Sequence, residues 1–100
     1  MKTIIEEQDG KFVATLEGEL DTVAALEVEK ALEPLYENTG KDIVFECKKL
    51  EYIASSGLRI LLTILKNAKE NGSEVILRNW SDNIKDVFNL TGFVNIFHFE

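Results

Sequence analysis

Two short runs that mix apolar and polar residues open the chain, and a turn pair separates them. The runs are TIIEE at positions 3–7 and KFVATLE at positions 11–17, with Asp9 and Gly10 between them. Asp-Gly between runs of β type favours a tight hairpin, because glycine accepts the positive φ that such turns require. The pattern therefore predicts an N-terminal β-hairpin with strands at about 3–7 and 11–17.

The spacing of apolar residues changes to a helical one after this hairpin. Apolar side chains three or four residues apart follow at Ala25, Val28, Leu32 and Leu35. Either Asp21 or Thr22 can cap this helix, because their side-chain oxygens accept hydrogen bonds from the first turn. Pro34 should end or kink the helix. Asn38 and Gly40 then mark a loop.

The rest of the chain alternates between short apolar runs and segments with helical spacing. We expect a strand at about 42–47, a loop at 48–55, a helix from Ser55 or Ser56 to about Asn71, a strand at about 74–78, a helix capped by Ser81, and a closing edge strand in LTGFVNIFHFE. Strands that alternate with helices need crossover connections. This ββαβαβαβ order predicts an α/β fold in one domain, residues 1–100: a mostly parallel central sheet with the hairpin at its N-terminus and helices packed on it.

The charge balance narrows the classes of partner. The formal net charge is −7, which argues against unaided binding to nucleic acid or to an anionic membrane surface and leaves room for a basic partner. No apolar stretch has the length of a signal peptide or a membrane span, so we expect no membrane insertion and a cytoplasmic location. The single cysteine, Cys47, lies in the apolar run DIVFEC and is interpreted as a buried structural thiol.

The sequence offers little support for catalysis. A nucleophilic serine needs a base, and the only histidine is His98, which stands between two phenylalanines in the last predicted strand. The segment ASSGL at 54–58 is not a nucleophile elbow, and neither metal-ligand spacing nor a phosphate-binding glycine loop is present. We therefore expect no catalytic residue, no metal and no cofactor.

The helix that follows the serines has an unusually broad apolar side. Its apolar residues cover an arc of about 200° at 100° per residue, and they are Leu58, Ile60, Leu61, Leu62, Ile64, Leu65 and Ala68. A helix on a sheet needs an apolar stripe only a little wider than about 100°. Two explanations stay open: neighbouring helices bury the excess, or an apolar flank near Ile60 and Ile64 faces a partner.

The adjacent serines admit two roles. Ser55 is the best N-cap, which would place Ser56 at the first helical position and Gly57 at the second. The same place favours an anion, because backbone N–H groups and the helix dipole point at it. A phosphate on Ser55 would have Arg59 one turn away and an open approach beside Gly57.

Three motifs carry a resemblance to a known family. GELD at 18–21, YIASSGLRILL at 52–62 and LTGFVNIFHF at 90–99 stand in an order and spacing that resemble a STAS domain, specifically a bacterial anti-sigma factor antagonist. The resemblance runs the whole length of the chain. It implies a regulatory protein without catalysis that binds an anti-sigma factor, which is itself a serine kinase.

The resemblance also implies a phosphorylation switch. In the family the kinase phosphorylates a serine at the start of the helix and binding is lost, and a phosphatase restores it. The usual motif is Asp-Ser-Ser-Gly-Leu with its first serine as the acceptor, a role that falls here on Ser55, with Ser56 as the alternative. Asp21 matches a family position near the phosphorylation site.

One departure from the family pattern concerns the residue before the expected phosphorylation site. Ala54 stands where the family has an aspartate whose charge could help to recruit the kinase or its metal. The residues expected to contact the partner are Asp21, Ala54, Ser55, Ser56, Gly57, Arg59, Ile60 and Ile64. An alternative function uses the same helix start: a STAS module that binds a small anion or nucleotide, or that serves as a subunit of a transport assembly.

Overall fold

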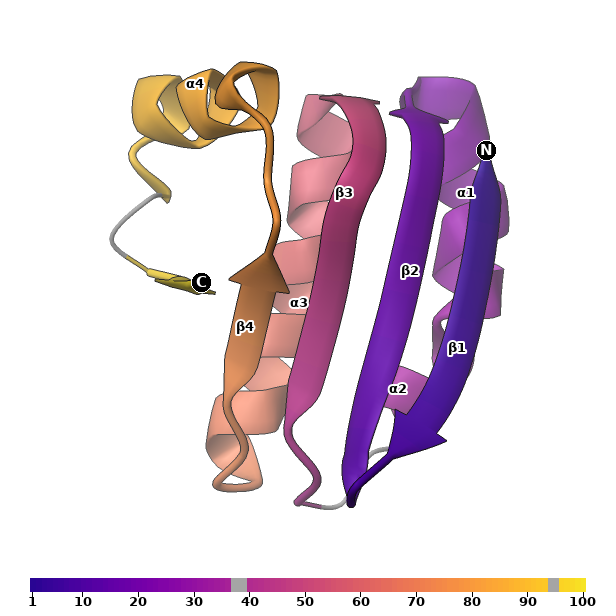
Figure 1. The fold of residues 1–100 in the computed structure, drawn as a ribbon, viewed down its shortest axis with the longest axis vertical. Coiled ribbons are helices and arrows are strands. Elements are labelled where there is room, and N and C mark those ends of the chain that lie inside the picture. The colour runs from indigo at the N-terminus through magenta and orange to yellow at the C-terminus, as the bar shows by residue number, and fades with distance from the viewer. Residues whose placement is uncertain (37–39, 94–95) are drawn as a thin grey trace.

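A five-stranded sheet in the order β1-β2-β3-β4-β5 forms the centre of the molecule (Figure 1). The computed structural model describes residues 1–36, 40–93 and 96–100. Strand β1 (Lys2–Gln8) pairs antiparallel with β2 (Lys11–Leu20), and the turn between them holds Asp9 at φ 52° and Gly10 at φ 77°. Positive φ at both positions is the geometry of a tight hairpin turn, so the predicted hairpin is confirmed.

The other strands are parallel, as the alternation of strands and helices predicts. Strand β2 pairs with β3 (Ile43–Ile53), β3 with β4 (Val75–Arg78), and β4 with β5 (His98–Phe99). The connections are helical: α1 (Thr22–Ala31) and α2 (Glu33–Tyr36) precede β3, α3 (Ser55–Glu70) precedes β4, and α4 (Asp82–Thr91) precedes β5. Helices α1, α2 and α3 cover one face of the sheet, and α4 lies beyond the end of β4 (Figure 1).

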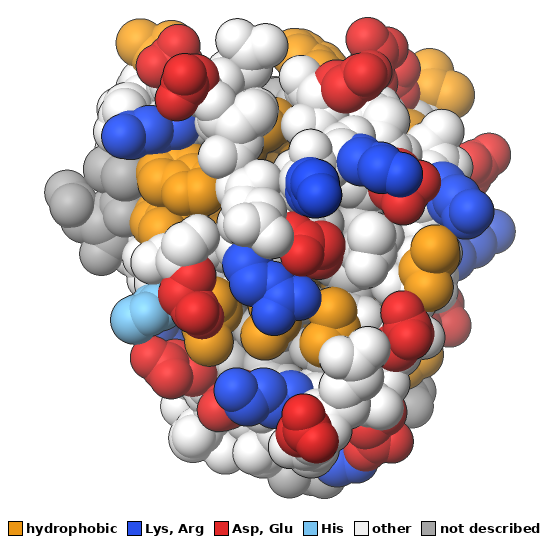
Figure 2. All heavy atoms as spheres, viewed as in Figure 1, with side chains coloured by type: hydrophobic (Ala, Val, Ile, Leu, Met, Phe, Trp, Pro, Cys, Tyr) orange, Lys and Arg blue, Asp and Glu red, His pale blue; other side chains and the backbone are white. Residues whose placement is uncertain are grey.

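The main core lies between the sheet and these three helices. Strand residues such as Phe45 and Leu77 meet helix residues such as Leu61 there, and all are at most 1% exposed. The other face has a short buried row in register across three strands, Val13, Val44 and Ile76. Figure 2 shows this face, where small apolar patches lie among acidic and basic side chains.

Local sequence signals set several boundaries as expected. Asp21 caps α1, because its Oδ1 accepts from the Ala24 N–H at 2.8 Å, and Ser81 caps α4 in the same way. Helix α1 ends at Ala31 with Leu32 as its C-cap, and Pro34 lies in the short α2 that follows, so the predicted break near Pro34 is confirmed. Gly40 has φ 105°, a conformation that suits glycine. The predicted loop residue Asn38 lies outside the described residues, as do Val94 and Asn95 of the expected closing segment.

One expected loop is wrong. Strand β3 does not end near position 47 but continues to Ile53, through most of the segment assigned to a loop. The reason is pairing with β2, which extends to Leu20↔Ile53 despite two register irregularities. Leu50 and Ile53 are both 2% exposed, so the core recruits this polar-looking stretch at only two positions. The longer strand places the serines directly beyond the carboxyl end of β3, next to the end of β2.

The lone cysteine is a structural residue, as predicted. Cys47 is 1% exposed in β3. Burial, and to a lesser extent the negative charge of Glu46, raises the pKa of its thiol to about 12. The neutral thiol therefore persists at physiological pH, and the nucleophilic thiolate is scarce.

Within residues 1–36, 40–93 and 96–100, helices long and apolar enough to cross a bilayer do not occur.

Candidate functional site

Strands β2 and β3 end side by side, and helices α1 and α3 begin directly after them. The Ala54 N–H donates to the Leu20 carbonyl at 2.8 Å, which ties the two strand ends together. The GELD and ASSG segments, far apart in sequence, therefore share one edge of the sheet. In open α/β sheets, binding sites lie at the carboxyl ends of parallel strands.

The start of α3 differs from the predicted one by a single residue. The N-cap is Ala54, with φ −84° and ψ 167°, and it makes no side-chain capping hydrogen bond. Ser55 is the first helical residue, so the prediction that its hydroxyl caps the helix is wrong. The shift arises because β3 runs to Ile53 and leaves Ala54 as the one residue between strand and helix.

The two serines occupy opposite environments. Ser55 is exposed. The Oγ of Ser56 is buried and has no hydrogen-bond partner. A hydroxyl in solvent can reach the active site of a modifying enzyme, whereas a buried one needs local opening first. The structure thus separates two residues that the sequence treats as alternatives.

Gly57 has a packing role, and the expectation that it leaves an open approach is wrong. The residue is buried, and a Cβ added to it would lie 2.7 Å from Leu20 Cγ and 3.0 Å from Ile53 Cγ1. Only a residue without a side chain lets the first turn of α3 approach the ends of β2 and β3 this closely. The glycine therefore sets where Ser55 sits.

Gly57→Ala is expected to destabilise the domain. Alanine is favoured over glycine in a helix by about 1 kcal/mol, but overpacking a well-filled site costs about 1–3 kcal/mol. Leu20 is completely buried, so overpacking should prevail, by up to about 2 kcal/mol. Urea unfolding followed by circular dichroism would measure this. The exposed Lys66→Ala on the same helix is the control, and a stabilised Gly57→Ala would contradict the packing argument.

The broad apolar side of α3 is buried by neighbouring elements. Ile60 is 7% exposed and Ile64 is completely buried, both within the main core. Helices α1 and α2 both pack against α3 on this face of the sheet. The alternative of an exposed partner-binding flank at Ile60 and Ile64 is therefore wrong.

A groove between α1 and α3 begins beside the serines. Its volume is about 350 Å³, and its lining residues include Ser56 and Arg59 from α3 and Leu26 from α1. Arg59 is exposed, and no ion pair of its guanidinium is present in the part of the chain that the structure describes. Asp21 is half-buried and is partly occupied as the cap of α1.

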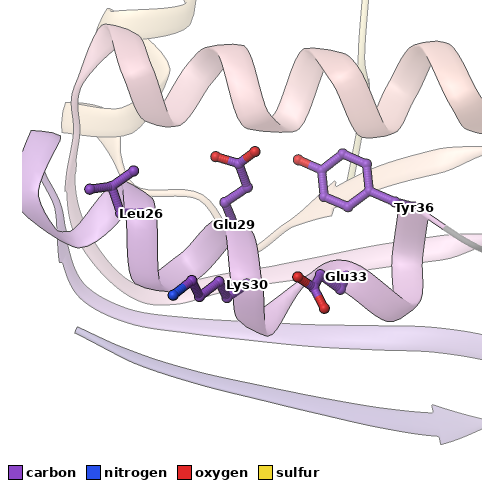
Figure 3. A pocket seen from close by; sticks show the side chains of 5 residues that line it. All are labelled: Leu26, Glu29, Lys30, Glu33 and Tyr36. Atoms are coloured by element: carbon purple, nitrogen blue, oxygen red, sulfur yellow. The ribbon is translucent and has the colours of Figure 1, made fainter.

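A second hollow adjoins this groove along α1 and α2, and the two share Leu26, Glu29 and Tyr36. Its volume is about 570 Å³, and it is lined by Leu26, Glu29, Lys30, Glu33 and Tyr36 (Figure 3). Leu26 and Glu29 point toward α3, the Tyr36 ring extends toward Glu29, and Lys30 and Glu33 lie on the side of α1 and α2 away from α3 (Figure 3). Burial, and secondarily the charge of Glu29, raises the pKa of the Tyr36 phenol above its usual value.

An acidic hollow lies beside the start of α1. Glu19, Asp21, Glu27 and Glu51 line it together with Met1 and Val23, and its volume is about 440 Å³. The sequence patterns did not predict this hollow or the groove, although two apolar residues three positions apart on the polar side of α1, Val23 and Leu26, are a visible signal, and both are exposed. Among the residues with described positions, no three histidine, cysteine, aspartate or glutamate side chains are placed so that together they could hold a metal ion.

The histidine and the serines do not form a catalytic arrangement. His98 is exposed in β5, where its Nδ1 lies 3.6 Å from Glu74 Oε1. Ser55 follows β3, and strand β4 separates β3 from β5.

Comparison with known proteins places the chain in a family. The model of the STAS domain family matches residues 2–100. The anti-sigma-B factor antagonist of Staphylococcus aureus is 30% identical over 91 residues, which is 91% of this chain and 84% of that protein. An anti-sigma factor antagonist from Mycobacterium paratuberculosis has a similar structure, with a TM-score of 0.83 and 28% identity over 98% of this chain and 83% of that one.

SpoIIAA from Bacillus shares the fold in two forms. Its unphosphorylated structure has a TM-score of 0.81, covering 99% of this chain and 88% of that one, and its phosphorylated structure has 0.74, covering 99% and 91%; identity is 21% in both. The match over nearly the whole chain, together with the serine-glycine helix start at the sheet edge, agrees with the motifs GELD, ASSGL and LTG. The chain belongs to the STAS domain family, in its group of bacterial anti-sigma factor antagonists.

Proposed function

We propose that this protein is a phosphorylation-switched anti-sigma factor antagonist of the cytoplasm. It binds an anti-sigma factor that is also a serine kinase, and it thereby frees a sigma factor for transcription. Phosphorylation of Ser55 ends the binding, and a phosphatase restores it. The family consists of regulatory binding proteins and not of enzymes, so the chemistry belongs to the partner.

The difference between the two serines carries the proposal. The Ser55 side chain stands in solvent at the first position of α3, while the Ser56 Oγ is buried. A kinase must bring the acceptor oxygen in line with the γ-phosphate of ATP. Ser55 can do so without unfolding of the helix start, and we assign the acceptor to it.

The start of α3 is suited to hold the phosphate. Ala54 offers no side-chain oxygen to the N–H groups of the first turn, unlike the capping residues of α1 and α4. The aspartate that is usual at this position in the family would fill that role, because aspartate is a good N-cap. Here a phosphate on Ser55 can accept from those N–H groups and gain about 0.3–1 kcal/mol from the helix dipole.

Charge favours a basic partner beside the switch. The acidic hollow contributes Glu19, Asp21, Glu27 and Glu51 next to the helix start. Ala54 and Ser55, at the start of α3, are themselves small and uncharged. We assign partner contact to the acidic hollow, to Ala54 and Ser55, and to Arg59. We withdraw Ile60 and Ile64 because they are buried.

SpoIIAA supports the phosphorylation step by analogy. It shares the fold and has been seen in both an unphosphorylated and a phosphorylated form. Those two states show that a domain of this architecture can carry the modification and stay folded.

A phosphate-transfer experiment tests the acceptor. Wild type, Ser55→Ala and Ser56→Ala would be incubated with ATP and the anti-sigma factor from the same organism, and intact masses measured. We expect wild type and Ser56→Ala to gain one phosphate and Ser55→Ala to gain none. Uptake by Ser55→Ala but not by Ser56→Ala would move the switch to Ser56. Binding without uptake by any of the three would mean an antagonist without the switch.

A further inference from the structure

We propose that the exposed face of α1, formed by Val23 and Leu26 and bordered by the acidic hollow, docks a basic amphipathic helix of the partner. The identity of the partner as an anti-sigma factor rests on the function proposed above. The docking face itself rests on exposure, charge and the shape of the groove along α1. We call it the α1 face.

The apolar residues of the α1 face are unusually exposed. Val23 is 80% exposed and Leu26 is 71% exposed, although the same helix buries Ala25 and Val28 in the core. Residues three apart lie on one side of a helix, so the two side chains form a continuous strip. Met1, which is 40% exposed, lines the same hollow as Val23 and extends the strip.

Acidic side chains border the strip at its Val23 end. Glu19, Asp21, Glu27 and Glu51 line the hollow that Val23 shares, and among the described residues no lysine or arginine lines it. At the other end of the strip, Leu26 leads into the groove that Ser56 and Arg59 also line. The α1 face is therefore continuous with the surface around the switch.

These features select one kind of occupant. An amphipathic helix lays apolar residues spaced by three or four positions into a groove, which matches a strip along α1 beside α3. Its flanking lysines and arginines would meet the carboxylates of the hollow, and such complementarity speeds and orients association. A second copy of this chain is disfavoured, because it would bring the same carboxylates and a net charge of −7.

Leu26→Asp tests the apolar strip, and Leu90→Asp is its matched control. Leu90 is also an exposed helical leucine, 87% exposed, but it lies on α4. In titration calorimetry against the anti-sigma factor, we expect Leu26→Asp to weaken binding by about tenfold or more, as truncation of a central apolar contact does. Leu90→Asp should bind as wild type does. Equal effects of the two changes would overturn the proposal.

Glu27→Lys tests the charge, with Glu70→Lys on α3 as a control that changes the net charge equally. Glu27 lines the hollow, and Glu70 is exposed at the last turn of α3. We expect Glu27→Lys alone to slow association by about tenfold at low salt and to flatten the dependence of the rate on salt. A salt dependence that Glu27→Lys leaves unchanged would contradict a basic partner helix at this place.

Photo-crosslinking separates a failure of this proposal from a failure of the proposed function. Benzoylphenylalanine would replace Leu26 or Leu90 in the protein expressed in its own cells, and the cross-linked peptides would be sequenced. Position 26 should capture a basic amphipathic segment that position 90 does not. Capture of such a segment from a protein other than an anti-sigma factor would sustain the α1 face and overturn the proposed function. Capture of a second copy of this chain, of an acidic segment, or of no protein would overturn the α1 face.

Discussion

Ile64→Asp is expected to unfold the domain. Ile64 is completely buried in the core between α3 and the sheet. An unpaired carboxylate in such a place costs several kcal/mol even after relaxation, and the large apolar side chain is lost as well. A domain of this size has a total stability of about 5–15 kcal/mol. We expect the cooperative thermal transition to disappear or to fall far below that of wild type.

Thr63→Asp is the matched control for this change. Thr63 precedes Ile64 on the same helix but is exposed, so its replacement should change the free energy of unfolding by no more than about 0.5 kcal/mol. Circular dichroism gives the melting curve, and fluorescence of Trp80, the single tryptophan, gives an independent probe. A normal melting temperature for Ile64→Asp, with loss of partner binding, would instead show that the apolar side of α3 faces a partner.

Ser55→Asp is expected to weaken binding to the anti-sigma factor by about a hundredfold. Ala54 and Ser55 are small and neutral, so a partner fitted closely to the serine hydroxyl would have to accommodate and desolvate the new carboxylate. A desolvated, unpaired charge at an interface costs several kcal/mol, and each 1.4 kcal/mol is tenfold in affinity. Aspartate carries one charge where phosphate carries about 1.5 to 2, so true phosphorylation should weaken binding further.

Two variants show whether the effect falls on the interface. Ser55→Ala should bind as wild type does, and its stability should change little, because the Ser55 hydroxyl is exposed and Ala54 is the N-cap. Ser56→Asp should instead lower the melting temperature, because the Ser56 Oγ is buried. Ser55→Asp should keep the wild-type melting temperature. If Ser55→Asp binds as tightly as wild type, the surface around Ser55 is outside the interface.

Signals confined to a few neighbouring residues were readable from the sequence. Asp9 and Gly10 form the hairpin turn, Asp21 and Ser81 cap their helices, and the break near Pro34 falls where it is expected. Each of these depends on backbone preferences and hydrogen bonds within about four residues. The order of strands and helices likewise predicted the mostly parallel sheet, because few topologies satisfy such an order.

Features set by contacts between distant segments required the tertiary structure. The length of β3 depends on its pairing with β2, and that length moves the N-cap of α3 to Ala54. The N-cap position then decides that the Ser55 side chain faces solvent and the Ser56 Oγ is buried, which identical residue types side by side could not reveal.

The same distinction applies to the apolar residues. A hydrophobic arc on a helix shows how much surface needs covering, but which element covers it depends on packing between elements far apart in sequence. Helix α1 packs against α3, where Ile60 and Ile64 are buried. It leaves its own Val23 and Leu26 exposed beside the acidic hollow. The motifs alone indicated the family, and packing decided which side chains around the start of α3 are exposed.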